Sequence, residues 1–368
     1  MTNPALQDIL TMLREGPLSL SAPPEESRAI FDAMFAEVPR PEGVHYEPGC
    51  VAGVDGLWVK PDNAPAGKAI LYAHGGGYVI GSPDTYASTI GHLASFTGLY
   101  VFAPNYRKAP EHPYPAGPDD MLAAYLGLLE AGYAEVVVGG DSAGGGLTMS
   151  LLLSCAEMGI DMPAGAVLWS PWLNLACDTE SHAFNEAHDP TLDAAGLHAS
   201  RFHYVGEDIP EHDILNPLTA DLSGLPPLLI QVGSIEILLD DATELAAEAG
   251  VKIYTIGIGA DELVVQGFFG PRRMNPSQDL DERSLMAIAE RTEGQYFRAR
   301  DLNELASIYQ KLDSIEPIEI EERIIRPEKA LFYWPLGLSV CLALVLWMTS
   351  LSAVQPLLPS IGRQRGES

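Results

Sequence analysis

Short β-rich segments alternate with longer amphipathic stretches through most of the chain, and this alternation restricts the possible fold more than any other feature. The β-rich segments are KAILYA (68–73), LYVFAP (99–104), EVVVGG (135–140), GAVLWS (165–170) and PLLIQVG (227–233), and the helical stretches cover residues 86–97, 118–130 and 143–158. This order predicts an α/β fold with a parallel sheet, right-handed crossovers and helices on both faces. Ligands of such sheets bind beyond the carboxyl ends of the strands, so we expect the chemistry in the turns that follow them.

The composition indicates a folded protein with a strong negative charge. Of the 368 residues, 47% are hydrophobic, which suffices for a large core. The 21 basic and 50 acidic side chains give a formal net charge of −29. Such a charge repels phosphate backbones and anionic lipid headgroups, so we expect no nucleic-acid partner. A small neutral molecule is the expected ligand.

Two segments interrupt the alternation, residues 1–45 and roughly 180–215, and we expect them to cap the sheet as a lid. The second contains five histidines: His182, His188, His198, His203 and His212. No two of them stand four residues apart on a helix with a carboxylate between them, the spacing that binds zinc. We therefore expect lid or surface histidines and no metal site.

The segment Gly140-Asp141-Ser142-Ala143-Gly144 joins a predicted strand to a predicted helix. A G-x-S-x-G sequence in this position indicates a sharp turn that exposes the serine oxygen above the sheet, as a nucleophile requires. The alternative is a glycine-rich helix start that packs on a strand. His74-Gly75-Gly76-Gly77 follows an earlier strand, and its glycines let backbone N–H groups converge on an oxyanion together with the N–H of Ala143. The two turns together predict an acyl-transfer site.

Four motifs, HGGGYVIGS, NYRKAPEHPYPAGPDD, GDSAGGGL and SPWLNL, resemble in order and spacing the hormone-sensitive-lipase-like (family IV) esterases of the α/β-hydrolase fold, over residues 1–249. The resemblance implies an α/β-hydrolase sheet with a helical cap and a serine carboxylesterase of short acyl esters that needs no cofactor. It implies Ser142 as nucleophile and Gly76, Gly77 and Ala143 as oxyanion donors. His74 and Asp141 would support their turns.

The sequence supplies a candidate for the acid of the triad but none for its base. Glu236 matches the position of the family's acid, although a glutamate there also suits a helix N-terminus, and Asp240 is the fallback. The base should be a histidine later in the chain, yet all nine histidines lie at or before His212. Counting without gaps places Leu263 where the histidine belongs. We expect the strand VKIYTIGIG to fill the last position of the sheet, and the base to be lost.

Residues 250–355 resemble the end of a bacterial membrane-anchored von Willebrand factor type A (vWA) protein, and residues 250–327 would be a truncated vWA-like segment. VKIYTIGIG and QYFRA predict strands, residues 281–292 predict a helix, and Asp301 with Glu304 predicts a capping box for ELASIYQKL. The Asp-x-Ser-x-Ser metal loop of that family is absent from the sequence. Residues 331–354 are mostly apolar and uncharged, which predicts a transmembrane helix.

These features predict four domains: a cap (1–45), a hydrolase core (46–249) with an insertion near 180–215, the vWA-like segment and the membrane helix. The first interpretation is an esterase with an incomplete triad, joined to a membrane anchor. The alternatives are a catalytically dead chimera, a membrane-anchored interaction protein that uses the vWA-like tail, and a soluble protein that binds esters without turnover. Unpaired cysteines and the lack of a signal peptide predict a cytoplasmic hydrolase on a membrane.

Overall fold

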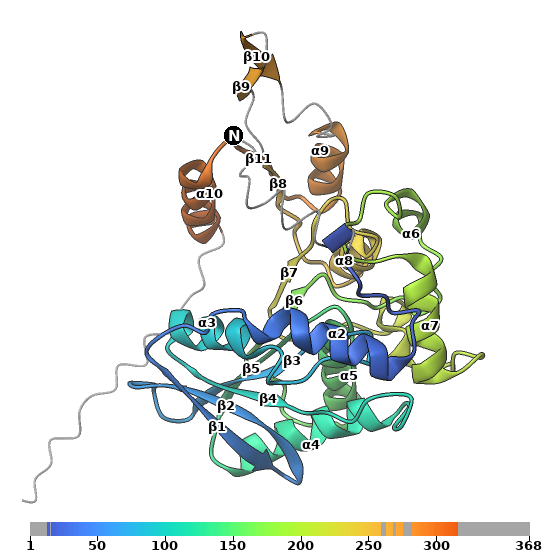
Figure 1. Cartoon of the computed structure of the whole chain (residues 1–368). Helices are drawn as coiled ribbons and strands as arrows, with labels where there is room; N and C mark the ends of the chain where they lie inside the picture. The colour runs from blue at the N-terminus through green and yellow to red at the C-terminus, as the bar shows by residue number, and fades with distance from the viewer. Residues whose placement is uncertain (1–12, 15, 259–262, 268–269, 275–281, 316–368) are drawn as a thin grey trace, which may run out of the picture. The chain divides into compact units, whose positions relative to one another are not determined.

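The computed structural model describes residues 13–14, 16–258, 263–267, 270–274 and 282–315 (Figure 1). The chain divides into two units, residues 1–311 and 312–368, and only the end of helix α10 is described in the second. The strands are β1 Val44–Val51, β2 Val54–Pro61, β3 Lys68–Ala73, β4 Tyr100–Pro104, β5 Glu135–Asp141, β6 Gly165–Trp169, β7 Leu228–Gln231, β8 Thr255–Ile258, β9 Leu263–Gly267, β10 Gly270–Met274 and β11 Tyr296–Ala299. The helices are α2 Pro24–Ala36, α3 Ala87–Thr97, α4 Ala116–Glu130, α5 Ala143–Met158, α6 Glu180–Phe184, α7 Ala194–Val205, α8 Leu239–Glu248, α9 Glu282–Arg291 and α10 Leu302–Ile315, with short 3₁₀ turns at Asp213–Leu215 and Pro217–Thr219.

A seven-stranded sheet forms the centre of the hydrolase part, in the order β1-β2-β4-β3-β5-β6-β7. The five strands from β4 to β7 run parallel, and β1 and β2 add an antiparallel hairpin at one edge. The predicted parallel α/β sheet is confirmed, and the predicted strand and helix positions agree with it to within a few residues. The hairpin was not predicted.

Alternate residues of each buried strand face opposite sides of the sheet, as the pleat requires. Ile70 and Tyr72 of β3 pack with α3, whereas Leu71 and Ala73 pack in the larger cluster that includes α4 and α5. In Figure 1, α3 covers one face of the sheet and α4 and α5 cover the other. Both faces are thus buried, which explains why the central strands read as nearly continuous apolar runs.

The two predicted cap segments contain helices. Helix α2 lies in the first, and α6, α7 and the first 3₁₀ turn lie in the second. Helix α2 has Pro24 in its first turn, and Phe31 packs into the larger core cluster. Helix α7 is capped by the Asp193 side chain, which accepts a hydrogen bond from the N–H of Gly196 (2.7 Å).

Strand β8 pairs in parallel with β11 and does not join the seven-stranded sheet. Helix α9 lies between them in the chain, so the segment makes its own β-α-β unit, in which the Thr255 hydroxyl donates to the carbonyl of Leu285 (2.8 Å). The expectation that this strand fills the last hydrolase position is wrong, because among the described strands β8 pairs with β11 and not with β7. The assignment of Leu263 to the histidine position rested on that expectation and is wrong too. Leu263 is the first residue of β9 and pairs with Met274 in the β9–β10 hairpin.

The predicted transmembrane helix, residues 331–354, lies outside the described residues. Within the described ranges, no helix combines the length and apolar character needed to cross a bilayer.

The expected capping box at the start of α10 is present in modified form. Asp301 accepts from the N–H of Glu304 (2.9 Å), and Glu304 accepts in return from the N–H of Arg300 rather than from Asp301 (2.8 Å).

Candidate active site

Ser142 lies at the turn between β5 and α5, with a backbone conformation of φ +50° and ψ −121°. A non-glycine residue with positive φ is strained, and the surrounding structure must hold it there. Its N–H donates to the carbonyl of Trp169 (3.0 Å), and its own carbonyl accepts from Trp172 (2.9 Å) and Gly146 (3.1 Å). The end of β6 and the loop after it therefore hydrogen-bond to both the N–H and the carbonyl of Ser142.

Glycines flank this turn because no side chain fits there. A Cβ atom at Gly140 would collide with the backbone of Gly144, and one at Gly144 would collide with the carbonyl of Ala73. Strand β3 and the start of α5 consequently approach more closely than alanine permits. The alternative interpretation of a plain glycine-rich helix start does not account for the strained Ser142, whereas an exposed nucleophile turn does.

The loop from His74 to Gly77 follows β3 and lies beside the serine turn. Gly76 and Gly77 have φ values of +119° and +61°, which glycine adopts readily. Asp141 fixes the loop, because its Oδ1 accepts from the N–H of Gly75 (3.0 Å) and from the Tyr72 hydroxyl (2.7 Å). Its Oδ2 accepts from the Tyr86 hydroxyl (2.8 Å). Burial raises the pKa of the Asp141 carboxyl, against the opposing effect of these hydrogen bonds.

The backbone N–H groups of Gly76, Gly77 and Ala143 donate to no acceptor within the part of the chain that the structure describes. Buried N–H groups are rarely left unpaired. Donors kept free beside a serine are the arrangement that stabilises an oxyanion during acyl transfer. These are the three donors expected from the sequence.

Glu236 follows β7, in the loop that leads into α8. Its Oε1 accepts from the N–H of Gly233 (2.7 Å). Burial raises the pKa of Glu236, whereas the side chain of Ser170, the residue after β6, and the Gly233 N–H lower it. Because β6 is the neighbour of β5, this carboxyl lies at the same end of the sheet as Ser142. Asp240, the fallback acid, instead accepts from the N–H of Ser181 in the cap insertion (2.7 Å).

None of the described histidines hydrogen-bonds to the Ser142 side chain. His74 is fully buried, its Nδ1 lies 2.7 Å from the carbonyl of Gly75, and its ring stacks on Tyr106 (4.4 Å between centroids). Burial lowers its pKa to about 3, so the ring is neutral. His182 is also buried and pairs with the Thr179 hydroxyl. His112 is exposed.

An aromatic cluster lies beside the serine turn. Tyr78 stacks on Tyr204 of α7 (3.9 Å), and Trp172 and Tyr114 lie at its sides. Trp172 and Tyr78 are buried in the core, so the cluster packs the cap insertion onto the hydrolase part. The sequence did not reveal Tyr204, because nothing in RFHYVG marks which residue of that helix faces inward.

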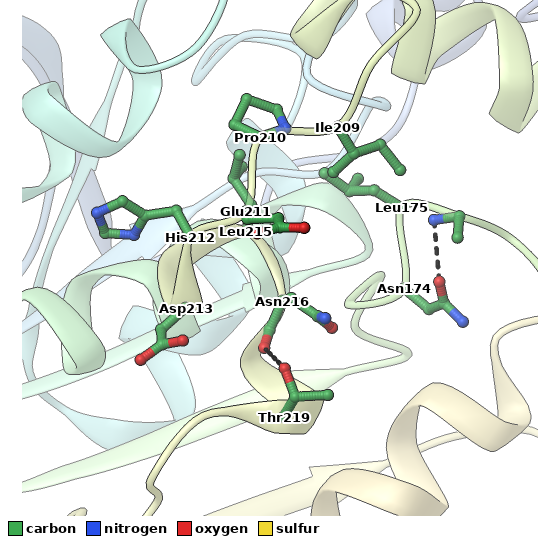
Figure 2. A pocket seen from close by; sticks show the side chains of 11 residues that line it. Asn174, Leu175, Ile209, Pro210, Glu211, His212, Asp213, Leu215, Asn216 and Thr219 are labelled. Atoms are coloured by element: carbon green, nitrogen blue, oxygen red, sulfur yellow. Dashed lines mark hydrogen bonds between the residues drawn. The ribbon is translucent and has the colours of Figure 1, made fainter.

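A cavity of about 410 Å³, whose lining does not include Ser142, lies at residues 209–216 of the cap insertion (Figure 2). It is lined by Asn174, Leu175, Ala176, Ile209, Pro210, Glu211, His212, Asp213, Leu215, Asn216 and Thr219. Across the described ranges, no three His, Cys, Asp or Glu side chains converge as metal ligands.

Residues 70–253, half of the chain, match the family of the alpha/beta hydrolase fold. The chain belongs to the α/β-hydrolases. An acetyl-hydrolase of Streptomyces hygroscopicus is 42% identical to this α/β-hydrolase over 201 residues, which cover 53% of this chain and 67% of that protein. An esterase of Acinetobacter venetianus is 38% identical over 244 residues, 65% of this chain and 80% of the relative.

A solved structure places the α/β-hydrolase within a branch of the family. The crystal structure of an esterase from the bacterial hormone-sensitive lipase family aligns with a TM-score of 0.65 and 37% identity, over 68% of this chain and 84% of that one. The hydrolase part is therefore a hormone-sensitive-lipase-like esterase domain, as its motifs predict.

Proposed function

We propose that this α/β-hydrolase cleaves carboxylic esters with short acyl groups, with Ser142 as nucleophile. The observation that carries the proposal is the strained Ser142 beside three free backbone donors, those of Gly76, Gly77 and Ala143. The relatives named acetyl-hydrolase and esterase support small acyl esters as substrates. Glu236 is the proposed acid.

We propose that the hydrolysis is slow, because the sequence supplies no histidine after His212 to take the serine proton. The oxyanion donors and substrate binding remain in such a site. In serine hydrolases that lack a triad member, these contributions leave roughly 10³- to 10⁴-fold acceleration over water. The same lack of a base favours a second candidate, a protein that binds esters without turnover.

The test is hydrolysis of p-nitrophenyl acetate by the full-length protein and by its Ser142→Ala variant. The expected result is a weak rate above buffer that the Ser142→Ala variant lowers only in part, because the oxyanion donors and substrate binding remain in both proteins. Equal background rates from two folded proteins would favour the second candidate, and calorimetry with a non-hydrolysable ester analogue would then measure the binding. Serine-dependent turnover at ordinary esterase rates would contradict the slow reaction and require a base at an unexpected position.

We also propose that residues 250–327 derive from a vWA protein and that residues 331–354 anchor the chain in a membrane, with the hydrolase in the cytoplasm. The resemblance of the tail and the apolar, uncharged run support this proposal. Deletion of residues 331–354 should move the protein from the membrane fraction to the supernatant. An unchanged distribution would contradict the anchor.

A further inference from the structure

The end of β6 and the loop that follows it hydrogen-bond to both backbone groups of Ser142. The carbonyl of Trp169, the last residue of β6, accepts from the N–H of Ser142, and the N–H of Trp172 in the loop donates to the carbonyl of Ser142. Trp172 is fully buried, and its ring N–H donates to the carbonyl of Asn174 (3.0 Å). The position of the nucleophile turn therefore depends on the loop from Trp169 to Asn174.

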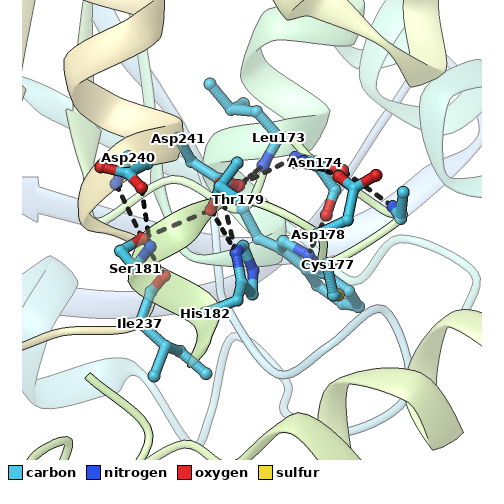
Figure 3. Close-up of polar contacts among 12 residues, drawn as sticks. Leu173, Asn174, Cys177, Asp178, Thr179, Ser181, His182, Ile237, Asp240 and Asp241 are labelled. Carbon is cyan, nitrogen blue, oxygen red and sulfur yellow. Dashed lines mark hydrogen bonds and ion pairs between the residues drawn. The ribbon is translucent and has the colours of Figure 1, made fainter. Parts of the chain in front are cut away.

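One carboxylate holds this loop from outside. Oδ2 of Asp241, in the first turn of α8, accepts hydrogen bonds from the N–H groups of Leu173 (2.7 Å) and Asn174 (2.8 Å), as Figure 3 shows. Within the described residues these two N–H groups have no other acceptor. Asp241 has no exposed surface, and Leu173 is 2% exposed, so water has little access to the hydrogen bond between them. Hydrogen bonds from backbone N–H groups to a buried carboxylate are among the stronger ones in proteins.

The other oxygen of Asp241 faces the cap insertion. Oδ1 makes no hydrogen bond within the described residues and lies 4.0 Å from Nδ1 of His182, which pairs with the Thr179 hydroxyl. The preceding residue, Asp240, binds the N–H of Ser181. Burial raises the pKa of Asp241 to about 7, and burial lowers the pKa of His182. Two consecutive carboxylates of α8 thus contact the loop behind the nucleophile and the cap insertion.

We propose that Asp241 is a positioning residue of the nucleophile turn, and that its Oδ2 atom keeps Ser142 in place through Leu173, Asn174 and Trp172. The proposal rests on the proposed function only in taking Ser142 as the nucleophile. Without this acceptor, two N–H groups would be left unpaired beside the buried Trp172, and the loop would open more often. The strained φ of Ser142 needs fixed neighbours, so such opening disturbs the turn.

The experiment is amide hydrogen exchange of the full-length protein, because it requires no turnover. In the wild-type protein, the amides of Leu173 and Asn174 should exchange slowly, although they lie in a loop. In Asp241→Ala, peptides covering residues 169–177 should exchange about tenfold to a hundredfold faster, which corresponds to the loss of a hydrogen bond to a charged acceptor. Peptides of β3 should keep the wild-type rate. Asp241→Asn retains an accepting oxygen and should restore slow exchange.

Asp240→Ala is the matched control, since it removes the neighbouring carboxylate. It should accelerate exchange near Ser181 and leave residues 169–177 unchanged. Unchanged exchange at 169–177 in Asp241→Ala, or equal acceleration in β3, would overturn the proposal. Fast exchange of residues 169–177 in Asp241→Asn would show that an accepting oxygen at this position is not what holds the loop. If Asp241→Ala does not fold, fast exchange of Leu173 and Asn174 in the wild-type protein would still overturn it.

Ester hydrolysis separates this proposal from the proposed function. Where Ser142-dependent turnover is measured, Asp241→Ala should lower kcat about tenfold with little change in KM, and Asp241→Asn should recover it. Turnover that does not depend on Ser142 would contradict the proposed function. The role of Asp241 would then be tested by hydrogen exchange alone. A kcat equal to wild type in a folded Asp241→Ala protein would overturn the positioning role.

Discussion

The serine turn and the β8–β11 segment are stabilised in different ways. The turn is held by residues far apart in the chain, from Ala73 to Trp172 and Asp241, at distances that leave no room for a methyl group. The β8–β11 segment is held by contacts within about 45 residues, and it leaves large apolar side chains such as Ile258 (62% exposed) in solvent. A closely packed turn is sensitive to a single added methyl group, whereas an exposed side chain such as Ile258 has fewer neighbours that a substitution can disturb.

The largest effect should come from adding one methyl group at the turn. Gly144→Ala places a Cβ against the backbone carbonyl of Ala73, which cannot rotate away. We expect a loss of more than about 4 kcal/mol in the free energy of unfolding, measured by urea denaturation. Gly165→Ala in β6 is the control, because its Cβ would make only an ordinary contact at 3.5 Å. Equal stability of the two variants would show that Gly144 and the carbonyl of Ala73 have room to move apart.

The next effect depends on pH and on Asp241. Its folded-state pKa of about 7 lies above the ordinary value of about 3.9, so its contribution to stability is greatest at low pH and falls as the pH rises from 4 to 7. Asp241→Asn does not titrate. Relative to wild type, this variant should therefore gain stability from pH 4 to pH 7, by about 4 kcal/mol at most, and no more above that.

Thermal unfolding of both proteins between pH 4 and 8 measures this difference. Asp240→Asn serves as the control, because Asp240 holds the cap insertion instead of the loop. A difference between wild type and Asp241→Asn that stays constant with pH would show that the buried carboxyl titrates outside this range.

The smallest effect should come from the tail. Asp301→Ala removes the oxygen that accepts from Asn303 and Glu304 at the start of α10. Loss of an N-cap destabilises a helix by about 1 kcal/mol, so exchange of α10 amides should rise about fivefold while the peptides of β3 and α5 keep their rates. Asn303→Ala is the control. Faster exchange in α5 would mean that the two regions are coupled.

The sequence predicted the elements whose pattern is long and regular. Helix α5 and strand β3 have the expected bounds, because both are largely apolar and end at a glycine or histidine turn. The β1–β2 hairpin was missed because Pro48, Gly49 and Gly56 interrupt its strands and its two-residue turn is Ala52-Gly53. Pro and Gly in a strand argue against it, yet at the edge of a sheet they are tolerated.

The sequence predicts the backbone geometry around Ser142 only where that geometry is set by local motifs. The serine turn and the glycine loop each lie within a few consecutive residues, so their geometry follows from the sequence. The contact of Asp241 with Leu173 joins residues 68 positions apart, and no local pattern indicates it. The wrong expectation for β8 has the same origin. Its apolar, β-branched pattern suits any buried parallel strand, and only the partner at β11 decides between sheets.

The strained backbone of Ser142 also bears on the stability of the fold. A residue with φ +50° costs about 1–3 kcal/mol in every folded molecule, whether or not an ester is cleaved. Glycine at this position would remove that strain at once. The serine side chain at this turn therefore lowers the stability of the fold that carries it, a cost that glycine would not impose.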